Sequence, residues 1–303
     1  MPSTSPDIFG PLPAIERSLG AAVAGVAATP RLREAVAYAT LGAGKRIRPL
    51  LAWHCCEALG GRGEDAMPAC VAVELVHCFS LVHDDLPALD NDDLRRGKPT
   101  VHVKFGEAMA VLAGDAMLNM ATLALAGPWE RGEGRSPGVR ASLLQTLGGA
   151  TACMIAGQVA DTEHDFDPAL TGAQQRLEFV HRNKTGALLV AACRMGAACA
   201  GLGGGVPRGD AGRTIWPFAD TLGLLFQAVD DLLDVTQSAE HTGKRTQKDA
   251  DAGKLTFPSV YGVERTREMI REYEAQAVGS VQALGEPAAP LVALAHLVAT
   301  RTR

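Results

Sequence analysis

The chain has 303 residues and a mass of 31.7 kDa, which is enough for one large domain or two small ones. Hydrophobic residues make up 47% of it and charged residues 21%, so the composition is that of an ordinary globular protein and excludes a disordered chain. The net charge of -5 and the pI near 5.9 argue against a nucleic-acid partner, because such binding relies on a basic surface.

Helical periodicity runs along almost the whole chain, whereas alternating runs of β-branched residues are almost absent. Aromatic residues make up only 5%, which also weighs against sheets. We predict helices over residues 11–28, 31–60 with a disturbance at Pro49, 67–86, 106–126, 138–163, 173–200, 210–236, 257–283 and 287–301. Glycine and proline clusters separate these segments, and no linker or low-complexity stretch divides the chain. The prediction is one all-α domain, 1–303, whose helices surround a common interior.

Seven cysteines stand at positions 55, 56, 70, 78, 153, 193 and 199, mostly in apolar stretches and without a CxxC pair. This usage favours free buried thiols in a reducing compartment over a disulfide framework. The N-terminus has no basic segment followed by an apolar core, and apolar runs such as Gly186 to Met195 are too short to span a bilayer. We therefore expect a cytoplasmic protein with no membrane partner.

Five aspartates crowd into the segment 84–93, directly after the apolar stretch of the helix predicted over 67–86. One interpretation is a solvated acidic loop. However, if that helix is buried, Asp84 and Asp85 end a core helix, where carboxylates without counter-charge are costly. Pro87 disrupts the helix one turn later and allows Asp90 to approach Asp84. Clustered carboxylates of this kind suit Mg²⁺, which binds proteins through one or two carboxylates together with substrate phosphates.

A second acidic group, Asp230, Asp231 and Asp234, falls inside the helix predicted over 210–236. Gln227 shares its helical stripe at the spacing i, i+3/i+4, i+7. Alone, this stripe could equally be an exposed acidic face. Two acidic clusters on opposing helices, however, can clamp several Mg²⁺ ions around one polyanion.

Basic residues complete the pattern. The segment GKRIRP at 44–49 resembles a piece of a nucleotide P-loop, but Ala39 stands where that loop needs glycine and no strand precedes it. What remains is either a donor cluster for phosphate oxygens or a surface basic patch. His77 lies two helical turns before Asp84 on nearly the same face, so we interpret it as a phosphate contact rather than a core histidine.

Further basic residues lie later in the chain. Lys184 and Thr185 fall in the middle of a predicted helix, and Lys244, Lys248 and Lys254 follow the second acidic group. Each alone is an ordinary solvent-facing lysine. Together they are what a lid that neutralises a diphosphate would carry.

These motifs resemble those of the trans-isoprenyl diphosphate synthases, and most of all the bacterial farnesyl diphosphate synthases. The stretch from His77 to Met117 is similar to their first aspartate-rich region, and FQAVDDLLD to the second. GKRIRP is similar to their isopentenyl diphosphate site, and GKLTFP to their final lysine region. The match covers about residues 31–270 in the right order; Gln247 departs from it, since many relatives have glycine there.

The resemblance implies an isoprenoid synthase fold, with about ten helices around a deep central cavity, and usually a homodimer. It implies head-to-tail condensation of an allylic diphosphate, dimethylallyl or geranyl, with isopentenyl diphosphate. It also implies Mg²⁺ as cofactor, in three ions that Mn²⁺ can replace. Farnesyl diphosphate is the expected main product, with geranylgeranyl diphosphate as the alternative.

By position, the resemblance assigns a function to individual residues. Metal ligands are Asp84, Asp90 and Asp230, supported by Asp85, Asp231 and Asp234. The allylic diphosphate is held by Arg95, Lys184, Thr185, Gln227 and Lys244, with Lys254 from the final lysine region. Isopentenyl diphosphate is held by Lys45, Arg48, His77 and Arg96. Phe79 and Ser80, on the helix before Asp84, are expected to set product length.

Two rival interpretations stay open. A class I terpene cyclase also uses an aspartate-rich helix with Mg²⁺, but its second site resembles Asn/Asp-x-x-Ser/Thr-x-x-x-Glu, and GKRIRP would have no function there. A non-catalytic subunit that regulates a related synthase typically loses an aspartate motif, and both motifs are intact here.

Overall fold

The computed structural model describes residues 6–26, 28–42, 44–127, 137–203, 211–236 and 254–302. These residues form an all-α structure, as predicted, with one short hairpin as its strand pair. Lys244, Gln247 and Lys248 lie outside the described residues.

The first half contains α1 (Leu12–Ala24), α2 (Pro30–Thr40), α3 (Ile47–Ala58), a 3-10 turn (Gly63–Ala66) and α4 (Met67–Asp84). The antiparallel hairpin β1 (Leu94–Arg95) and β2 (Lys98–Pro99) pairs Leu94 with Pro99, and α5 (Val101–Phe105) and α6 (Glu107–Ala126) follow. The second half contains α7 (Pro137–Glu163), α8 (Ala173–Val180), a π-helical turn (His181–Gly186), α9 (Ala187–Cys199) and a 3-10 turn (Ala200–Gly203). The chain continues with α10 (Ala211–Thr236), α13 (Phe257–Tyr261) and α14 (Val263–Val281), and then with 3-10 turns at Gln282–Leu284 and Glu286–Ala288 and α15 (Ala289–Thr300).

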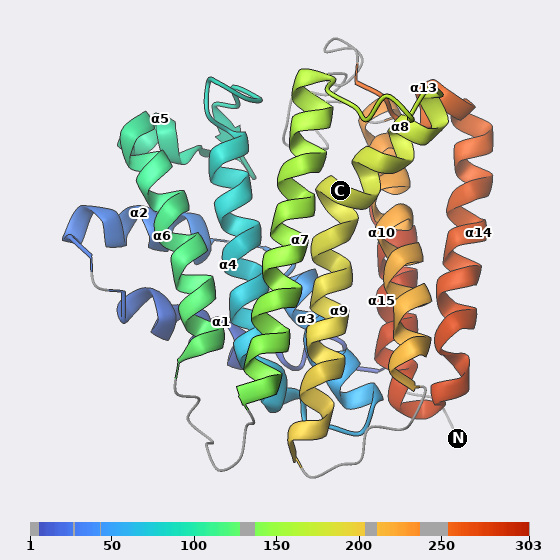
Figure 1. The fold of residues 1–303 in the computed structure, drawn as a ribbon, viewed down its shortest axis with the longest axis horizontal. Coiled ribbons are helices and arrows are strands. Elements are labelled where there is room, and N and C mark those ends of the chain that lie inside the picture. Colours follow the sequence, from blue (N-terminus) through green and yellow to red (C-terminus); the bar gives the residue numbers. More distant parts are fainter. Residues whose placement is uncertain are drawn as a thin grey trace.

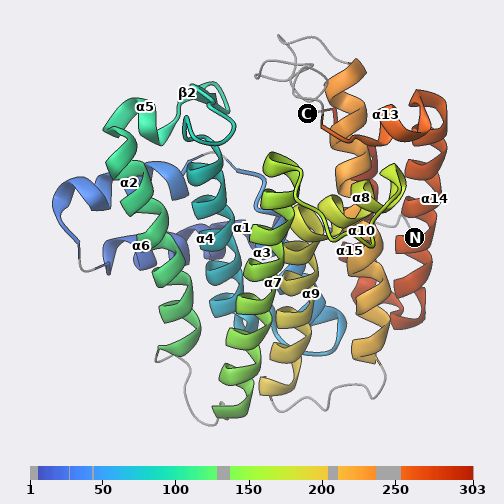
Figure 2. The same cartoon turned by 45° about the horizontal axis from the view of Figure 1, so that its top comes forward.

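The long helices stand side by side as a bundle (Figure 1). Helix α4 packs along α6, α10 along α14, and α9 along both α3 and α7, while α1 and α2 run across the bundle and contact α4. The hairpin, α8 and α13 lie together at one end, the top of Figure 1, which Figure 2 brings forward. Helices α4, α7 and α10 finish at that end, so their C-terminal residues share one region of the molecule.

Two predicted helices are broken where the backbone becomes left-handed. The segment 31–60 does not run through to Pro49; it stops at Thr40 and resumes at Ile47, after Arg46 with φ of 52°. Pro49 lies in the first turn of α3, where a missing N–H costs nothing. The segment 257–283 is interrupted at Gly262, whose φ of 82° suits glycine.

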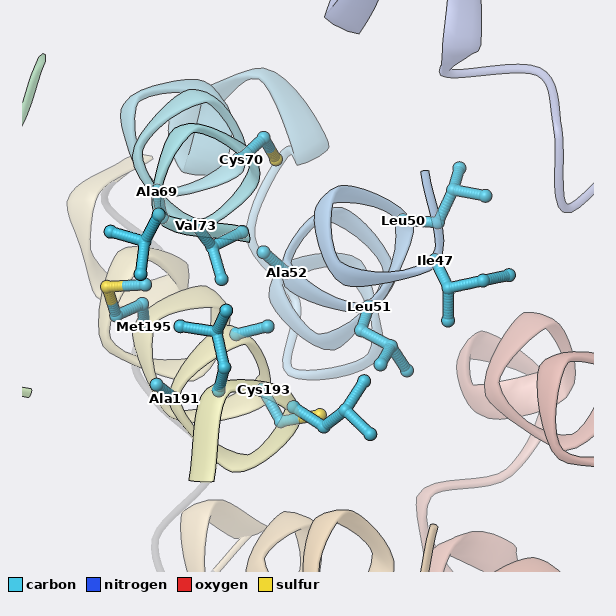
Figure 3. Packing of buried hydrophobic residues seen from close by; sticks show 14 of the residues in the cluster. Ile47, Leu50, Leu51, Ala52, Ala69, Cys70, Val73, Ala191, Cys193 and Met195 are labelled. Atoms are coloured by element: carbon cyan, nitrogen blue, oxygen red, sulfur yellow. The ribbon is translucent and has the colours of Figure 1, made fainter. Parts of the chain in front are cut away.

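The core is built on close helix contacts, for example between α3, α4 and α9 (Figure 3). Ala52 of α3 and Val73 of α4 face α9, and both are fully buried. Gly196 of α9 lies so near α3 that a Cβ there would stand 2.1 Å from the Ala52 carbonyl oxygen. Any side chain at Gly196 would force these two helices apart.

All seven cysteines are free thiols, as expected, but only six are buried; Cys153 is exposed on α7. The expectation that no apolar segment could span a bilayer was wrong by length and hydropathy. Three helical segments of the described chain, Gly63–Asp84, Glu107–Ala126 and Pro137–Glu163, meet both criteria. Of the apolar window in Gly63–Asp84, 67% is buried inside the protein, whereas the share is 39% for each of the other two.

Candidate functional site

The first aspartate group closes on itself at the end of α4. The backbone N–H of Asp90 donates to the Asp84 carbonyl at 2.9 Å, so the chain after Pro87 turns back as predicted. Burial, and then the negative charges of Asp90 and Asp85, raise the pKa of Asp84 to about 6, although Lys184 and Arg95 act to lower it. This carboxyl therefore stands where added positive charge stabilises it.

Asp85, by contrast, is already paired. It is 3% exposed and accepts from Arg95 Nε at 3.0 Å, and Arg95 comes from the hairpin that follows. Burial opposes the charged form of Arg95, but the Asp85 carboxylate raises its pKa above the ordinary value. The pair ties the hairpin onto the end of α4, which supports the position of Asp84.

An aspartate that sequence reasoning missed joins two of the expected lysines. Asp161, near the end of α7, accepts from Lys184 Nζ at 2.6 Å and lies 3.3 Å from Lys254 Nζ. Lys254 also donates to Asp90 at 3.2 Å. Burial alone would raise the pKa of Asp161, but these two ammonium groups hold it below its ordinary value. A signal for it existed, because Asp161 continues the buried stripe of α7 through Met154 and Gly157.

Lys184 and Thr185 project from the π-helical turn between α8 and α9. This turn packs directly on α7, where a Cβ at Gly157 would meet the Lys184 backbone nitrogen at 2.2 Å. Single π turns inside helices often mark functional sites, since they redirect side chains without ending the helix. Here the turn directs Lys184 to Asp161 and Thr185 to Gln227 of α10, whose Oε1 accepts from the Thr185 hydroxyl at 2.8 Å.

The members of the second aspartate group differ in their surroundings. The Asp230 side chain is 44% exposed and pairs with Arg301 Nη2 at 2.8 Å. Asp231 is 2% exposed and accepts from Gln227 Nε2 and from the backbone N–H of Phe257. Asp234 is half-buried. Arg301 follows α15, and its position at the far end of the sequence gives no hint of this pairing.

The two arginines of the basic segment 44–49 differ: Arg46 is bonded within the protein, whereas Arg48 has a donor available for a ligand. Arg46 is 2% exposed and bonded to Glu16 at 2.7 Å and Glu74 at 2.6 Å, so it secures the loop instead of facing a ligand. Arg48 is different: its Nε is buried and has no hydrogen-bond partner in the described chain, and burial lowers its pKa. A buried guanidinium with an unused donor is suited to an incoming anion.

Arg96 and His77 gather at the same segment, and Lys45 stands between Gly44 and Arg46 within it. The Arg96 guanidinium lies against Gly44, where a Cβ would meet its Nη1 at 2.8 Å. Burial and then the positive charges of Arg48 and Arg96 hold the pKa of His77 well below its ordinary value. The structure therefore brings the residues predicted for isopentenyl diphosphate into one positive region.

Phe79 and Ser80 lie on α4 within two turns of Asp84. Phe79 is 7% exposed and its ring meets the His83 ring edge-on, with centroids 5.4 Å apart. His83 in turn packs on α6, 3.1 Å from the Val111 carbonyl oxygen. Ser80 donates to the His77 carbonyl of its own helix at 3.0 Å.

The donor set fits Mg²⁺, although no group of three or more His, Cys, Asp or Glu side chains in the described residues forms a ready-made metal site. Mg²⁺ needs only one or two carboxylates when substrate phosphates supply other oxygens. Asp84, Asp90 and the half-exposed Asp230 offer such carboxylates, and burial, which raises the pKa of Asp84, makes a nearby cation favourable for its charged form.

An all-α bundle with two aspartate groups and a separate cationic segment defines a class: enzymes that bind diphosphates through carboxylate-held metal ions. Comparison with known proteins gives the family, because the Polyprenyl synthetase profile matches residues 29–286. The chain belongs to the polyprenyl synthetase family of trans-prenyltransferases, which use isopentenyl diphosphate, an allylic diphosphate and divalent metal ions.

Relatives with this architecture come from plants and bacteria. The chain is 46% identical to "Putative geranylgeranyl pyrophosphate synthase 8, chloroplastic" of Arabidopsis thaliana, over 89% of this chain and 74% of that protein. It is 42% identical to the Capsicum annuum chloroplastic geranylgeranyl pyrophosphate synthase, over 89% and 71%. A geranyltransferase structure from Legionella pneumophila aligns with a TM-score of 0.83 and 30% identity, over 97% and 96%. An FPP/GFPP synthase structure from Zymomonas mobilis aligns with a TM-score of 0.76 and 32% identity, over 97% of each chain.

The raised pKa of Asp84 predicts that its charge destabilises the metal-free protein. The loss in the free energy of unfolding is absent below about pH 4, where the carboxyl is protonated in both the folded and the unfolded protein. It is complete above about pH 6, and by linkage it amounts to about 2–3 kcal/mol. Asp84→Asn should therefore raise the melting temperature in EDTA at pH 8 by roughly 3–6 °C. The gain should vanish near pH 4. Asp93→Asn, an exposed acid of the same segment, is the control. An unchanged or lower melting temperature for Asp84→Asn at pH 8 would contradict the assignment.

Proposed function

We propose that this chain is a short-chain prenyl diphosphate synthase that forms farnesyl diphosphate as its main product. The observation that carries the proposal is the meeting of Asp90 and Asp161 with Lys184 and Lys254 at the end of the bundle where α4, α7 and α10 finish, beside a separate positive region.

The allylic diphosphate is assigned to the carboxylate-rich side. When bound there, Mg²⁺ neutralises the charge that grows on the leaving diphosphate, which allows the allylic C–O bond to ionise. Asp84, Asp90 and Asp230 would hold the metal. Lys184 and Lys254 already converge on Asp161, so their ammonium groups are placed to bind the phosphate oxygens of a ligand in the same space. Thr185, Gln227 and Arg95 lie next to these groups, and Lys244 is assigned to them by resemblance.

Isopentenyl diphosphate is assigned to Lys45, Arg48, His77 and Arg96. The lowered pKa of His77 keeps its imidazole neutral near pH 7, so it contributes a hydrogen bond without adding to the crowding of positive charge. The unused Nε of Arg48 supplies a further donor. Two sites of different character keep the two diphosphates apart and set which substrate ionises.

The first test concerns the metal and the carboxylates. Turnover of geranyl and isopentenyl diphosphates should require Mg²⁺ or Mn²⁺ and stop in EDTA, and Asp84→Ala and Asp230→Ala should each lower kcat by at least about 100-fold. Radiolabelled isopentenyl diphosphate with product chromatography gives the readout. Asp93→Ala is the matched control. Near-normal turnover in either variant, with a normal circular dichroism spectrum, would refute the metal assignment; a cyclic hydrocarbon product would favour a terpene cyclase.

Phe79 carries the proposed product length. Its ring lies on α4 just below the aspartates, facing His83 at the contact with α6, and a growing chain that runs down α4 from the diphosphate would reach it. Geranylgeranyl diphosphate is the second candidate, because the plant relatives are named for that product.

Phe79→Ala should remove this obstacle and shift the products toward longer chains, while total turnover stays within about threefold. Chromatography of dephosphorylated products measures the shift. Phe105→Ala, which truncates a buried aromatic of α5 instead of α4, controls for loosened packing. If the wild-type protein makes mainly geranylgeranyl diphosphate, or the variant leaves the distribution unchanged, Phe79 does not limit the chain.

We also propose a homodimer in which α6 and α7 face the second copy. Large apolar side chains are exposed on both helices, with exposed fractions of 53% for Leu112, 59% for Leu123 and 50% for Ile155. Helix α7 also exposes small residues at Gly148, Ala152 and neighbouring positions, which permit close approach of another helix. A surface of this kind is usually covered by a partner.

Light scattering should therefore give twice the chain mass of 31.7 kDa. Leu112→Glu combined with Leu123→Glu should give the monomer mass, because two carboxylates would be buried without partners. Phe9→Glu alters an exposed apolar residue before α1 and should leave the dimer intact. A wild-type monomer, or a dimer that survives the double substitution, would show that α6 is not the interface.

A further inference from the structure

Adjacent residues Asp230 and Asp231 face different parts of the molecule. Successive positions on an α-helix point about 100° apart, so the two carboxylates cannot serve one ligand in the same way. The Asp230 side chain is 44% exposed, whereas Asp231 is 2% exposed. Both oxygens of Asp231 already accept protein donors: Oδ1 from Gln227 Nε2 and Oδ2 from the Phe257 backbone N–H, each at 2.8 Å.

His181 closes the remaining side of Asp231. It is the first residue of the π-helical turn, and its ring stacks on the Phe257 ring with centroids 5.2 Å apart and planes 8° apart. This stacking places His181 Nε2 3.2 Å from Asp231 Oδ2, outside hydrogen-bond geometry. The two side chains are 5% and 2% exposed, so water does not separate them.

The contacts of Asp231 lead to two groups assigned to the allylic diphosphate. Because Gln227 Nε2 donates to Asp231, its Oε1 is turned toward the Thr185 hydroxyl, which donates to it at 2.8 Å. A flipped Gln227 amide would lose the bond to Asp231, because two acceptor oxygens would then face each other. On the other side, the bond to Phe257 anchors the segment that begins at Lys254, whose Nζ reaches Asp90 and Asp161.

We propose that Asp231 and His181 are positioning residues: Asp231 is not a metal ligand but fixes Gln227, Thr185 and the Lys254 segment in place, and His181 holds Asp231 and Phe257 against each other. This inference rests on the proposed function for the identity of the ligand, while the arrangement itself can be tested without turnover.

The decisive experiment compares Asp230→Asn with Asp231→Asn in two measurements that need no catalysis. Binding of Mn²⁺ with inorganic diphosphate, followed by electron paramagnetic resonance, should weaken at least tenfold in Asp230→Asn and stay within twofold in Asp231→Asn. Hydrogen exchange should show the opposite: the amides of residues 254–261 lose protection in Asp231→Asn, because an asparagine cannot accept from both donors, and keep it in Asp230→Asn.

Kinetics supply the second arm. Asp231→Asn should raise KM for geranyl diphosphate about tenfold and change KM for isopentenyl diphosphate less than twofold. Arg48→Ala should show the reverse pattern. His181→Phe keeps the stacked ring and should stay close to wild type in hydrogen exchange, whereas His181→Leu should lose protection and raise KM for geranyl diphosphate. Glu178→Gln, an exposed residue one turn before the π-helical turn, is the control.

The outcomes separate cleanly. If Asp231→Asn loses Mn²⁺ binding as Asp230→Asn does, with exchange unchanged, Asp231 is a metal ligand and the inference is wrong. If His181→Leu matches wild type in exchange and in both KM values, His181 does not position anything. If the wild-type chain shows no prenyl transfer, the proposed function fails, and the exchange and Mn²⁺ measurements still decide the part played by Asp231.

Discussion

The arrangement of this protein depends on the free-energy cost of placing several carboxylates together at the end of an apolar helix bundle. Asp84 ends a helix most of whose other residues are buried, and Asp85 and Asp90 lie beside it. Desolvation and like charge together raise the pKa of Asp84 to about 6. Such a site is stable only with counter-charge nearby, and the arrangement of the surrounding helices can be understood as the supply of that charge.

Four basic residues supply it, each from a different part of the chain. Arg95 of the hairpin pairs with Asp85, Lys184 of the π-helical turn with Asp161, Lys254 with Asp90 and Asp161, and Arg301 with Asp230. In the proposed function, Asp90 and Asp230 would hold metal ions, and the ammonium groups of Lys184 and Lys254 would bind phosphate oxygens. A diphosphate would then enter where cations already stand close to its charge, which limits the desolvation cost of binding.

The sequence predicted the all-α fold, the order of the helices and both aspartate groups, because periodicity and clustered charge are local signals. It did not predict the break at Arg46, since a left-handed residue held by Glu16 and Glu74 depends on two other helices. It also missed Asp161 and Arg301, whose partners lie 23 to 93 and 71 positions away respectively. The π-helical turn packs against Gly157 of α7, a contact that no sequence periodicity reveals.

Asp231 shows why the sequence of a motif alone does not assign a function to each of its residues. Asp230 and Asp231 are the same residue type in the same motif, yet one pairs with the Arg301 side chain after α15 and the other is buried and bonded to the first residue of α13. Their difference arises from the helix itself, which turns the two side chains to different neighbours. A buried carboxylate with three close protein contacts resists exchange for metal ligation, because each donor it released would be left unsatisfied. The same burial that removes Asp231 from the metal makes it able to hold Gln227 and the Lys254 segment in fixed relation, so one aspartate can bind while the next keeps the binding site in shape.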